Sequence, residues 1–233
     1  MNDSSAQRTN SAGTTTAMRG RLMPGLGLAC MGLLFGGLAV GVALGGVIPL
    51  PYGPIASVAM YVRAEPIAVQ VIAIGTFASS VPLALYAAIA SARLRQLGAT
   101  SSAAAIALTG GILAAGALGL TGLLAWPLSR PEVSADTALV RAISLLVFLV
   151  GSPGHLVALG LLVASMAAPS LIRGLLSRPL AWTGLAIAAL AAATILVLVW
   201  PTLGVILPVA RVSALVWLVA AGALWPRADL DSV

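Results

Sequence analysis

The stretch ALVRAISLLVFLVGSPGHLVALGLLVASMAA, residues 138–168, decides the fold. Arg141 lies near its start, and His155, the only histidine of the chain, lies about halfway along it. The stretch is longer than the roughly 20 apolar residues that a helix needs to cross a bilayer. We therefore expect a transmembrane helix here, with further hydrophobic helices packed around it.

The composition extends this prediction to the whole chain. Of the 233 residues, 60% are hydrophobic and 8% are charged, whereas a soluble domain carries about 25% charged residues. The 12 basic residues are all arginines, and they lie singly or in pairs between apolar runs, so nucleic acid is not an expected partner. The composition predicts an all-α, polytopic transmembrane helix bundle whose main partner is the lipid bilayer.

Six apolar runs are candidate spans, and short loops with arginines and prolines separate them. The last run is the shortest, because only 15 uncharged residues separate Arg211 from Arg227. About 20 apolar residues are needed to cross, so we expect Arg211 at or just inside the membrane edge. The predicted spans are 22–50, 66–92, 101–126, 138–168, 180–200 and 211–227.

The segments outside the spans differ from them in polarity and charge. Residues 1–21 are polar and basic, which predicts a disordered cytoplasmic tail, and residues 228–233 form a short acidic tail. The transmembrane domain is then 22–227. Its first run is longer than the 7 to 15 apolar residues of a signal peptide, so we expect a retained helix. Near Pro54, a short helix is expected at the interface, with Tyr52 and Tyr61 at headgroup depth.

The arginines predict the orientation of the bundle. With six spans, both termini lie on one side, which carries eight arginines against four on the other. The positive-inside rule then predicts that both termini are cytoplasmic and that the protein is a multi-pass protein of the plasma membrane. The eight arginines are Arg8, Arg19, Arg21, Arg93, Arg95, Arg173, Arg178 and Arg227, and the four are Arg63, Arg130, Arg141 and Arg211.

Two of the predicted helices carry small residues at four-residue spacing. Such stripes let helix backbones approach each other closely in lipid, where hydrophobic association is weak. The first helix is therefore expected at the centre of the bundle, with a dimer face as the alternative. The predicted packing residues are Gly37, Gly41, Gly45, Gly111, Ala115 and Gly119.

His155 is the main candidate for a functional side chain within the membrane, since ionisable groups at mid-depth are functional candidates by default. Helical spacing places Arg141, Ser144, Phe148, Ser152 and His155 close to one stripe, which could form a path for a proton or ligand. The structural alternative is a neutral His155 that bonds to a serine or threonine, or to a carbonyl freed by Pro153.

The predicted spans lack the side chains that ion coupling and metal binding need. All six acidic residues lie in loops or tails, so no carboxylate is available at mid-depth for ion coupling. A lone histidine and the lone Cys30 cannot build a metal site. We therefore predict no metal, no cofactor and no catalytic residue, and a non-enzymatic role is favoured.

One charged cluster is expected at the outer ends of the second, fourth and sixth helices. The simpler interpretation is that these are topology charges with weak surface pairing. The alternative is an outward cleft in which Arg141 and Arg211 hold an anionic headgroup or substrate. The cluster comprises Arg63, Arg141, Arg211, Glu65, Glu132 and Asp136.

Four segments resemble a family. They are YVRAEP (Tyr61 to Pro66), GHLVALGLLVAS (Gly154 to Ser165), RPLAWTGLAIA (Arg178 to Ala188) and RVSALVWLVAAGALWPR (Arg211 to Arg227). Over most of residues 22–227 the chain is similar to a large family of uncharacterised multi-pass membrane proteins of bacteria, especially high-GC ones, catalogued as a domain of unknown function. The resemblance implies a helical fold in the cell membrane and no particular activity.

Two classes of function follow. The first is a non-enzymatic membrane component that binds a lipid, a hydrophobic partner or another membrane subunit. The second is a small permease or membrane-embedded enzyme with an outward-facing site around Arg141, His155 and Arg211. For either class the candidate ligand-binding residues are His155, Arg141, Arg211, Ser152 and Trp217.

Overall fold

The computed structural model describes the backbone of residues 3–49 and 53–225 and the side chains of residues 22–49, 53–54 and 56–225. In these ranges the regular secondary structure is entirely helical, and six helices are long and apolar enough to cross a membrane. The predicted all-α bundle with six spans is confirmed. The spans are Leu22–Gly45, Pro66–Gln96, Ser101–Ser129, Thr137–Arg173, Arg178–Leu198 and Pro201–Leu224.

The secondary structure is finer than the six spans, because several spans change helix type along their length. The elements in chain order are α1 (Asp3–Gly45), α2 (Ile55–Ala64), α3 (Pro66–Gln96), α4 (Ser101–Ala125), η1 (Trp126–Ser129), α5 (Pro131–Ser134), α6 (Thr137–Leu149), η2 (Val150–Gly154), α7 (His155–Arg173), α8 (Arg178–Ala193), η3 (Thr194–Leu198), η4 (Pro201–Val205) and α9 (Ile206–Leu224).

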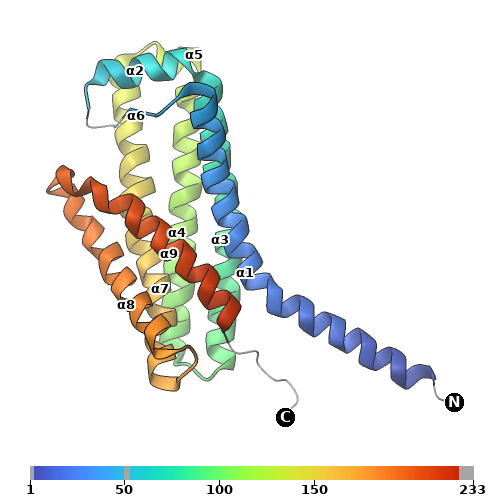
Figure 1. The fold of residues 1–233 in the computed structure, drawn as a ribbon. Helices are drawn as coiled ribbons and strands as arrows, with labels where there is room; N and C mark the ends of the chain where they lie inside the picture. Colours follow the sequence, from blue (N-terminus) through green and yellow to red (C-terminus); the bar gives the residue numbers. More distant parts are fainter. Residues whose placement is uncertain (1–2, 50–52, 226–233) are drawn as a thin grey trace.

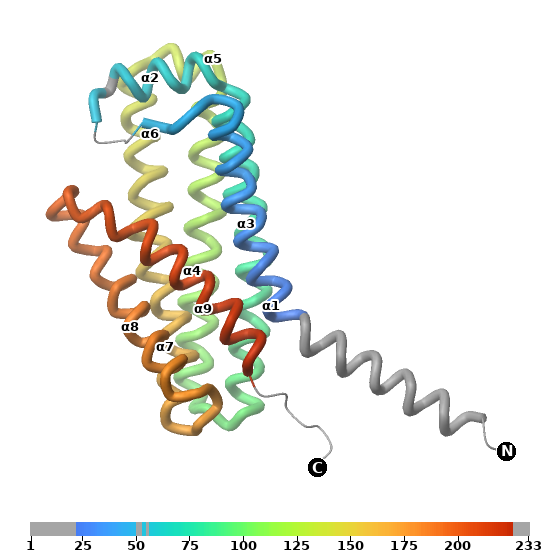
Figure 2. Tube along the Cα trace, viewed as in Figure 1, coloured from blue at the N-terminus to red at the C-terminus, as the bar shows by residue number. Residues whose placement is uncertain are grey.

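The helices pack in a chain of neighbours around α3 and α4. Helix α3 packs against α1 and α4, α4 packs against α7, and α7 packs against α8. Helix α9 contacts α1, α7 and α8, and it crosses the bundle obliquely in both ribbon and tube views (Figures 1 and 2). At one end, α2 lies across the bundle (Figure 1). We call this end of the bundle the α2 end.

The first helix does not lie at the centre of the bundle as predicted, since it is the least buried of the six spans. Small residues set the distance between neighbouring helices. A Cβ atom at Gly75 of α3 would lie 2.8 Å from the Cα atom of Gly37 on α1, so the two backbones touch. Gly41 and Gly45 of α1 also face α3, where an added Cβ would meet Ile72 and Glu65. On α4, Gly111 and Gly119 face Ala87 and Ser80 of α3, and Ala115 is buried. Close backbone approach is the packing mode expected in lipid.

The α2 end is held by side chains that satisfy helix termini. Arg63 of α2 donates to the carbonyl oxygens of Ser134 and Ala135, at 2.7 and 2.9 Å, and to the hydroxyl of Thr137. These are the unpaired carbonyls at the end of α5. Asp136 caps α6 by accepting from the backbone N–H groups of Ala138 and Leu139. Charged groups thus fix α2 to the start of α6.

Two sequence predictions need correction. The fourth span is longer than 138–168 and is interrupted by a π-helical turn, η2, around Pro153. The sixth span begins earlier than 211, because the candidate span starts at Pro201 and continues through η4 and Pro208 into α9. Pro201 and Pro208 predict a turn before the helix, so the predicted span is too short, and the position of Arg211 relative to the membrane edge stays a prediction.

Three predictions concern residues that the structure does not describe in full. The acidic tail at 228–233 and Tyr52 lie outside the described residues. The disordered character of residues 1–21 stays a prediction, since their side chains are not described.

Candidate functional site

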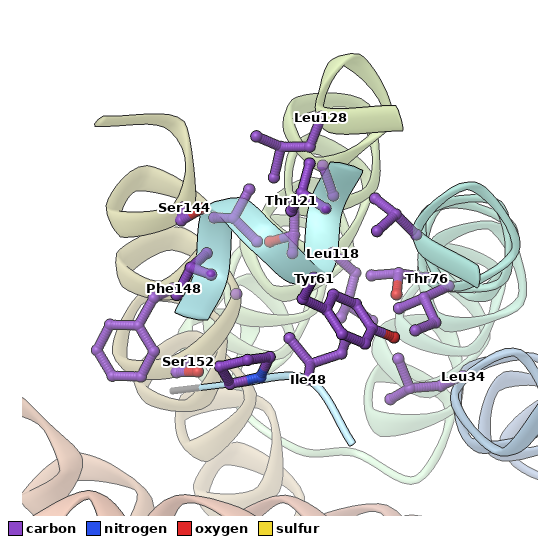
Figure 3. A pocket seen from close by; sticks show the side chains of 18 of the residues that line it. Leu34, Ile48, Tyr61, Thr76, Leu118, Thr121, Leu128, Ser144, Phe148 and Ser152 are labelled. Atoms are coloured by element: carbon purple, nitrogen blue, oxygen red, sulfur yellow. The ribbon is translucent and has the colours of Figure 1, made fainter. Parts of the chain in front are cut away.

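A cavity of about 270 Å³ lies inside the bundle at the α2 end. Its walls come from α1 and the loop after it, from α2, α3, α4, α6 and α9, and from the turns η1 and η2. Figure 3 shows Ser144, Phe148 and Ser152 on one side of it, and Thr76 and Leu34 on the other. The lining residues are Leu34, Ile48, Pro49, Val58, Tyr61, Val62, Val69, Ile72, Thr76, Leu118, Thr121, Ala125, Leu128, Ser144, Val147, Phe148, Gly151, Ser152 and Arg211.

Arg211 is the only charged side chain among the described residues that line this cavity. It extends from α9 and donates a hydrogen bond from its Nη2 atom to the carbonyl oxygen of Gly151 in η2. Its Nε atom is buried and has no hydrogen-bond partner among the described residues. A guanidinium has five N–H donors, so this bond leaves most of its donor capacity available.

The π turn explains why the Gly151 carbonyl can accept from Arg211. In a regular α-helix this carbonyl would accept the N–H group of His155, four residues later. Pro153 has no N–H group for the carbonyl of Leu149, four residues earlier. The turn shifts to π spacing, and the N–H group of His155 bonds to the carbonyls of Val150 and Ser152 in place of that of Gly151. The Gly151 oxygen is therefore left for a partner from another helix. Single π turns of this kind occur frequently at functional sites.

Gly151 also allows α4 and η2 to approach each other. A Cβ atom at this position would lie 2.7 Å from the side chain of Thr121 on α4. Any larger residue would push η2 away from α4 and move the carbonyl that holds Arg211. The glycine is needed here for space.

The other polar groups of the cavity are neutral. Ser144 has a buried hydroxyl without a hydrogen-bond partner in the described part of the chain. The buried serines of α7, Ser165 and Ser170, lie outside the cavity and bond to carbonyls of their own helix. Tyr61 of α2 donates to the carbonyl of Gly46 at 3.3 Å. Burial, and then the nearby Glu65 carboxylate, raise the pKa of the Tyr61 hydroxyl. The hydroxyl therefore stays a neutral donor at physiological pH.

His155 lies outside the cavity lining. It is completely buried, and its Nδ1 atom lies 2.9 Å from the carbonyl oxygen of Ala114 on α4. A carbonyl can only accept, so Nδ1 carries the hydrogen and the ring is the Nδ1–H tautomer. Its Nε2 atom is buried and unpartnered among the described residues. The geometry is that of a neutral histidine linking two helices.

The structure does not bring the remaining predicted site residues together. Arg141 is exposed on α6 and does not line the cavity. Trp217 on α9 is buried against Gly184, and its indole N–H donates to the carbonyl of Leu180 at 2.8 Å. Of the five candidate ligand-binding residues, only Arg211 and Ser152 line the cavity.

The predicted outer charge cluster forms no ion pairs among the described residues. No salt bridge joins Arg63, Arg141 or Arg211 to Glu65, Glu132 or Asp136, all of which lie in the described part of the chain. Arg63 and Asp136 satisfy backbone groups instead. Arg211 therefore has no carboxylate partner within this set.

Comparisons of this chain with known protein families, with curated proteins and with solved structures give no match. The resemblance of its segments to a bacterial membrane protein family stays a prediction. Inference about function therefore depends on the cavity.

The sequence contains a signal for part of this site. Pro153 within an apolar span removes the N–H partner of the Leu149 carbonyl and so predicts an irregular turn with unpaired carbonyls nearby. The sequence does not show which side chain supplies the missing donor, because Arg211 lies 60 residues further along the chain. The cavity itself has no local signal, since nine separate elements or loops contribute to its walls.

Proposed function

We propose that this protein is a non-enzymatic membrane component that binds an amphipathic ligand with an anionic group. The observation that carries the proposal is that Arg211 is the only charged side chain among the described residues lining an otherwise neutral, mostly apolar cavity. The anionic group would bind the guanidinium, and the apolar part of the ligand would fill the remaining space. Apolar walls with a few polar groups are typical of ligand sites.

The electrostatics of the cavity support an anionic ligand. A charged group within the hydrocarbon region is costly unless it is paired, and the Gly151 carbonyl is a neutral partner. A guanidinium is well suited to hold a carboxylate or phosphate through parallel hydrogen bonds. A cationic ligand would be repelled, and a neutral ligand would leave the charge without compensation.

The alternative of a permease or enzyme built on Arg141, His155 and Arg211 is less well supported. It requires the three side chains to share one site, but Arg141 is exposed and His155 does not line the cavity. A binding function needs only Arg211 and the apolar walls.

We also propose that both termini are cytoplasmic and that the α2 end faces outward from the plasma membrane. The support is the distribution of arginines on the two sides of the six spans, eight against three once Arg211, which lies within the sixth span, is left out of the count. In this orientation the cavity lies in the outer half of the bundle.

A thermal-shift series tests the proposed binding function. The protein in nanodiscs would be heated with single-chain amphiphiles of equal chain length that carry a carboxylate, a phosphate, a hydroxyl or a trimethylammonium group. A ligand that binds the folded state raises the midpoint temperature, with about 2.7 kcal/mol of stabilisation at a hundred times Kd. We expect stabilisation by the anions alone, and its loss in Arg211→Gln but not in Arg141→Gln. Equal shifts in wild type and Arg211→Gln would refute the proposal.

A further inference from the structure

We infer that the ligand is a compact, single-chain organic acid that binds with its carboxylate at Arg211 and its chain towards α2, and not a two-chain membrane phospholipid. This inference rests on the proposed function and narrows the class of ligand. Three features of the cavity carry it: the depth of its only charged residue, its size, and the distribution of its apolar walls.

Arg211 lies well away from the α2 end of the bundle. The guanidinium binds the carbonyl of Gly151, which follows the start of α6 at Thr137 by 14 residues. At about 1.5 Å per residue, the guanidinium lies about 20 Å along the helix from the α2 end. A carboxylate bound at Arg211 therefore lies inside the bundle and not at its α2 end.

The size of the cavity also favours a compact, single-chain ligand. At about 270 Å³ it lies just below the range of roughly 300 to 1,000 Å³ that is usual for small-molecule sites. It has space for a short hydrocarbon chain or a small ring system, and not for two long acyl chains.

The apolar walls indicate which way the ligand points. Val58 and Val62 of α2 and Leu128 of η1 line the cavity at the α2 end, whereas Arg211 and Gly151 line it further along the bundle, because Gly151 follows the start of α6 by 14 residues. A carboxylate at Arg211 therefore places the ligand's apolar chain towards α2. Val58 and Val62 are themselves buried, so α2 covers this end of the cavity.

Photo-crosslinking tests the orientation and the class of ligand together. The full chain in nanodiscs would be labelled with a medium-chain carboxylic acid that carries a diazirine at the end of its chain, and the modified peptide identified by mass spectrometry. We expect saturable labelling of α2 or of η1. A two-chain phosphatidic acid with a diazirine at the end of one chain is the comparison probe, and it should give no saturable labelling of the cavity lining.

Variants connect the labelling to the site. A hydrogen bond to a charged group contributes about 1.5 to 3 kcal/mol, so Arg211→Gln should reduce saturable labelling affinity by roughly ten- to a hundredfold. Arg211→Lys keeps the charge and should retain part of the affinity. Arg141→Gln, which removes a charge outside the cavity, should behave as wild type. Val147→Phe reduces the cavity without touching the charge, and it should also abolish labelling.

The outcomes separate the inference from the proposed function. Labelling of α9 or η2 by the diazirine of the acid would show that the chain end lies at Arg211 and would overturn the orientation. Arg211-dependent labelling by phosphatidic acid would overturn the ligand class while leaving the proposed function intact. If no anionic probe labels the cavity in a way that depends on Arg211, the proposed function fails, and the inference fails with it.

Discussion

Arg211 of α9 donates a hydrogen bond to the carbonyl oxygen of Gly151, which lies 60 residues earlier in the chain. The bond joins the last helix of the bundle to a π turn in the middle of the fourth span. It holds a guanidinium against a largely apolar cavity, where one neutral acceptor leaves the charge uncompensated. An anionic ligand would complete the pairing.

Pro153→Ala tests whether the π turn positions Arg211. The substitution restores an N–H group, so a regular α-helix can form and the Gly151 carbonyl returns to the N–H group of His155. We expect affinity for a medium-chain carboxylate to fall about five- to tenfold, since one hydrogen bond that orients the guanidinium is lost, while thermal stability does not fall. Titration in nanodiscs measures both. Pro169→Ala, in α7 and outside the cavity, is the control, and equal affinities in the two variants would argue against a positioning role.

His155→Ala tests whether the histidine is structural. The ring is fully buried and bonds to Ala114, so its removal leaves a cavity and costs roughly 2 to 4 kcal/mol of unfolding free energy. The carboxylate affinity of the folded fraction should remain within about twofold of wild type. His155→Phe refills the space and should recover part of the stability. A large loss of affinity in the stable His155→Phe variant would instead place the histidine in the binding site.

Gly75→Leu tests the contact between α1 and α3. A Cβ atom there would lie 2.8 Å from the backbone atoms Gly37 Cα and Leu33 O, and backbone atoms cannot move aside as a flexible side chain can. We expect a loss of about 2 to 3 kcal/mol in unfolding free energy, measured by denaturant titration in mild detergent. Gly32→Leu is the matched control, because nothing lies within 4 Å of its added Cβ. Similar losses in both variants would mean that this contact does not limit the packing.

Arg63→Gln tests how α2 is held over the cavity. Arg63 makes three hydrogen bonds to the segment from Ser134 to Thr137, and glutamine is too short to replace them. We expect hydrogen exchange of the α2 amides to accelerate about tenfold, as for the loss of about 1.4 kcal/mol of local stability. Arg95→Gln, an exposed arginine at the other end of α3, should leave α2 unchanged. Unaltered exchange in Arg63→Gln would show that apolar contacts alone fix α2.

The number of spans could be predicted from the sequence because bilayer thickness sets the length of an apolar helix. The same counting made the last span too short. It assumed that Pro201 and Pro208 end the chain's passage through the membrane, but the span continues through both prolines. Prolines are tolerated in membrane helices when neighbouring groups satisfy the freed carbonyls, and that depends on tertiary contacts.

The candidate site could be predicted only in part. Helical spacing places Arg141, Ser152 and His155 near one stripe, yet a change of helix type at η2 separates their environments: Ser152 lines the cavity, His155 packs against α4, and Arg141 is exposed. A regular 3.6-residue period does not describe a π turn. The pairing of Arg211 with Gly151 joins residues from distant segments, which no local pattern encodes.

The central claim is that Arg211 holds the acidic group of a ligand within the membrane. The most direct measurement is an electron cryomicroscopy map of the protein in nanodiscs with a saturating medium-chain carboxylate. The account predicts ligand density in the cavity, with its acidic end within hydrogen-bond distance of the Arg211 guanidinium and its chain directed towards α2. A map in which the cavity is empty, or in which the density avoids Arg211 and the guanidinium pairs with another group of the protein, would contradict the account.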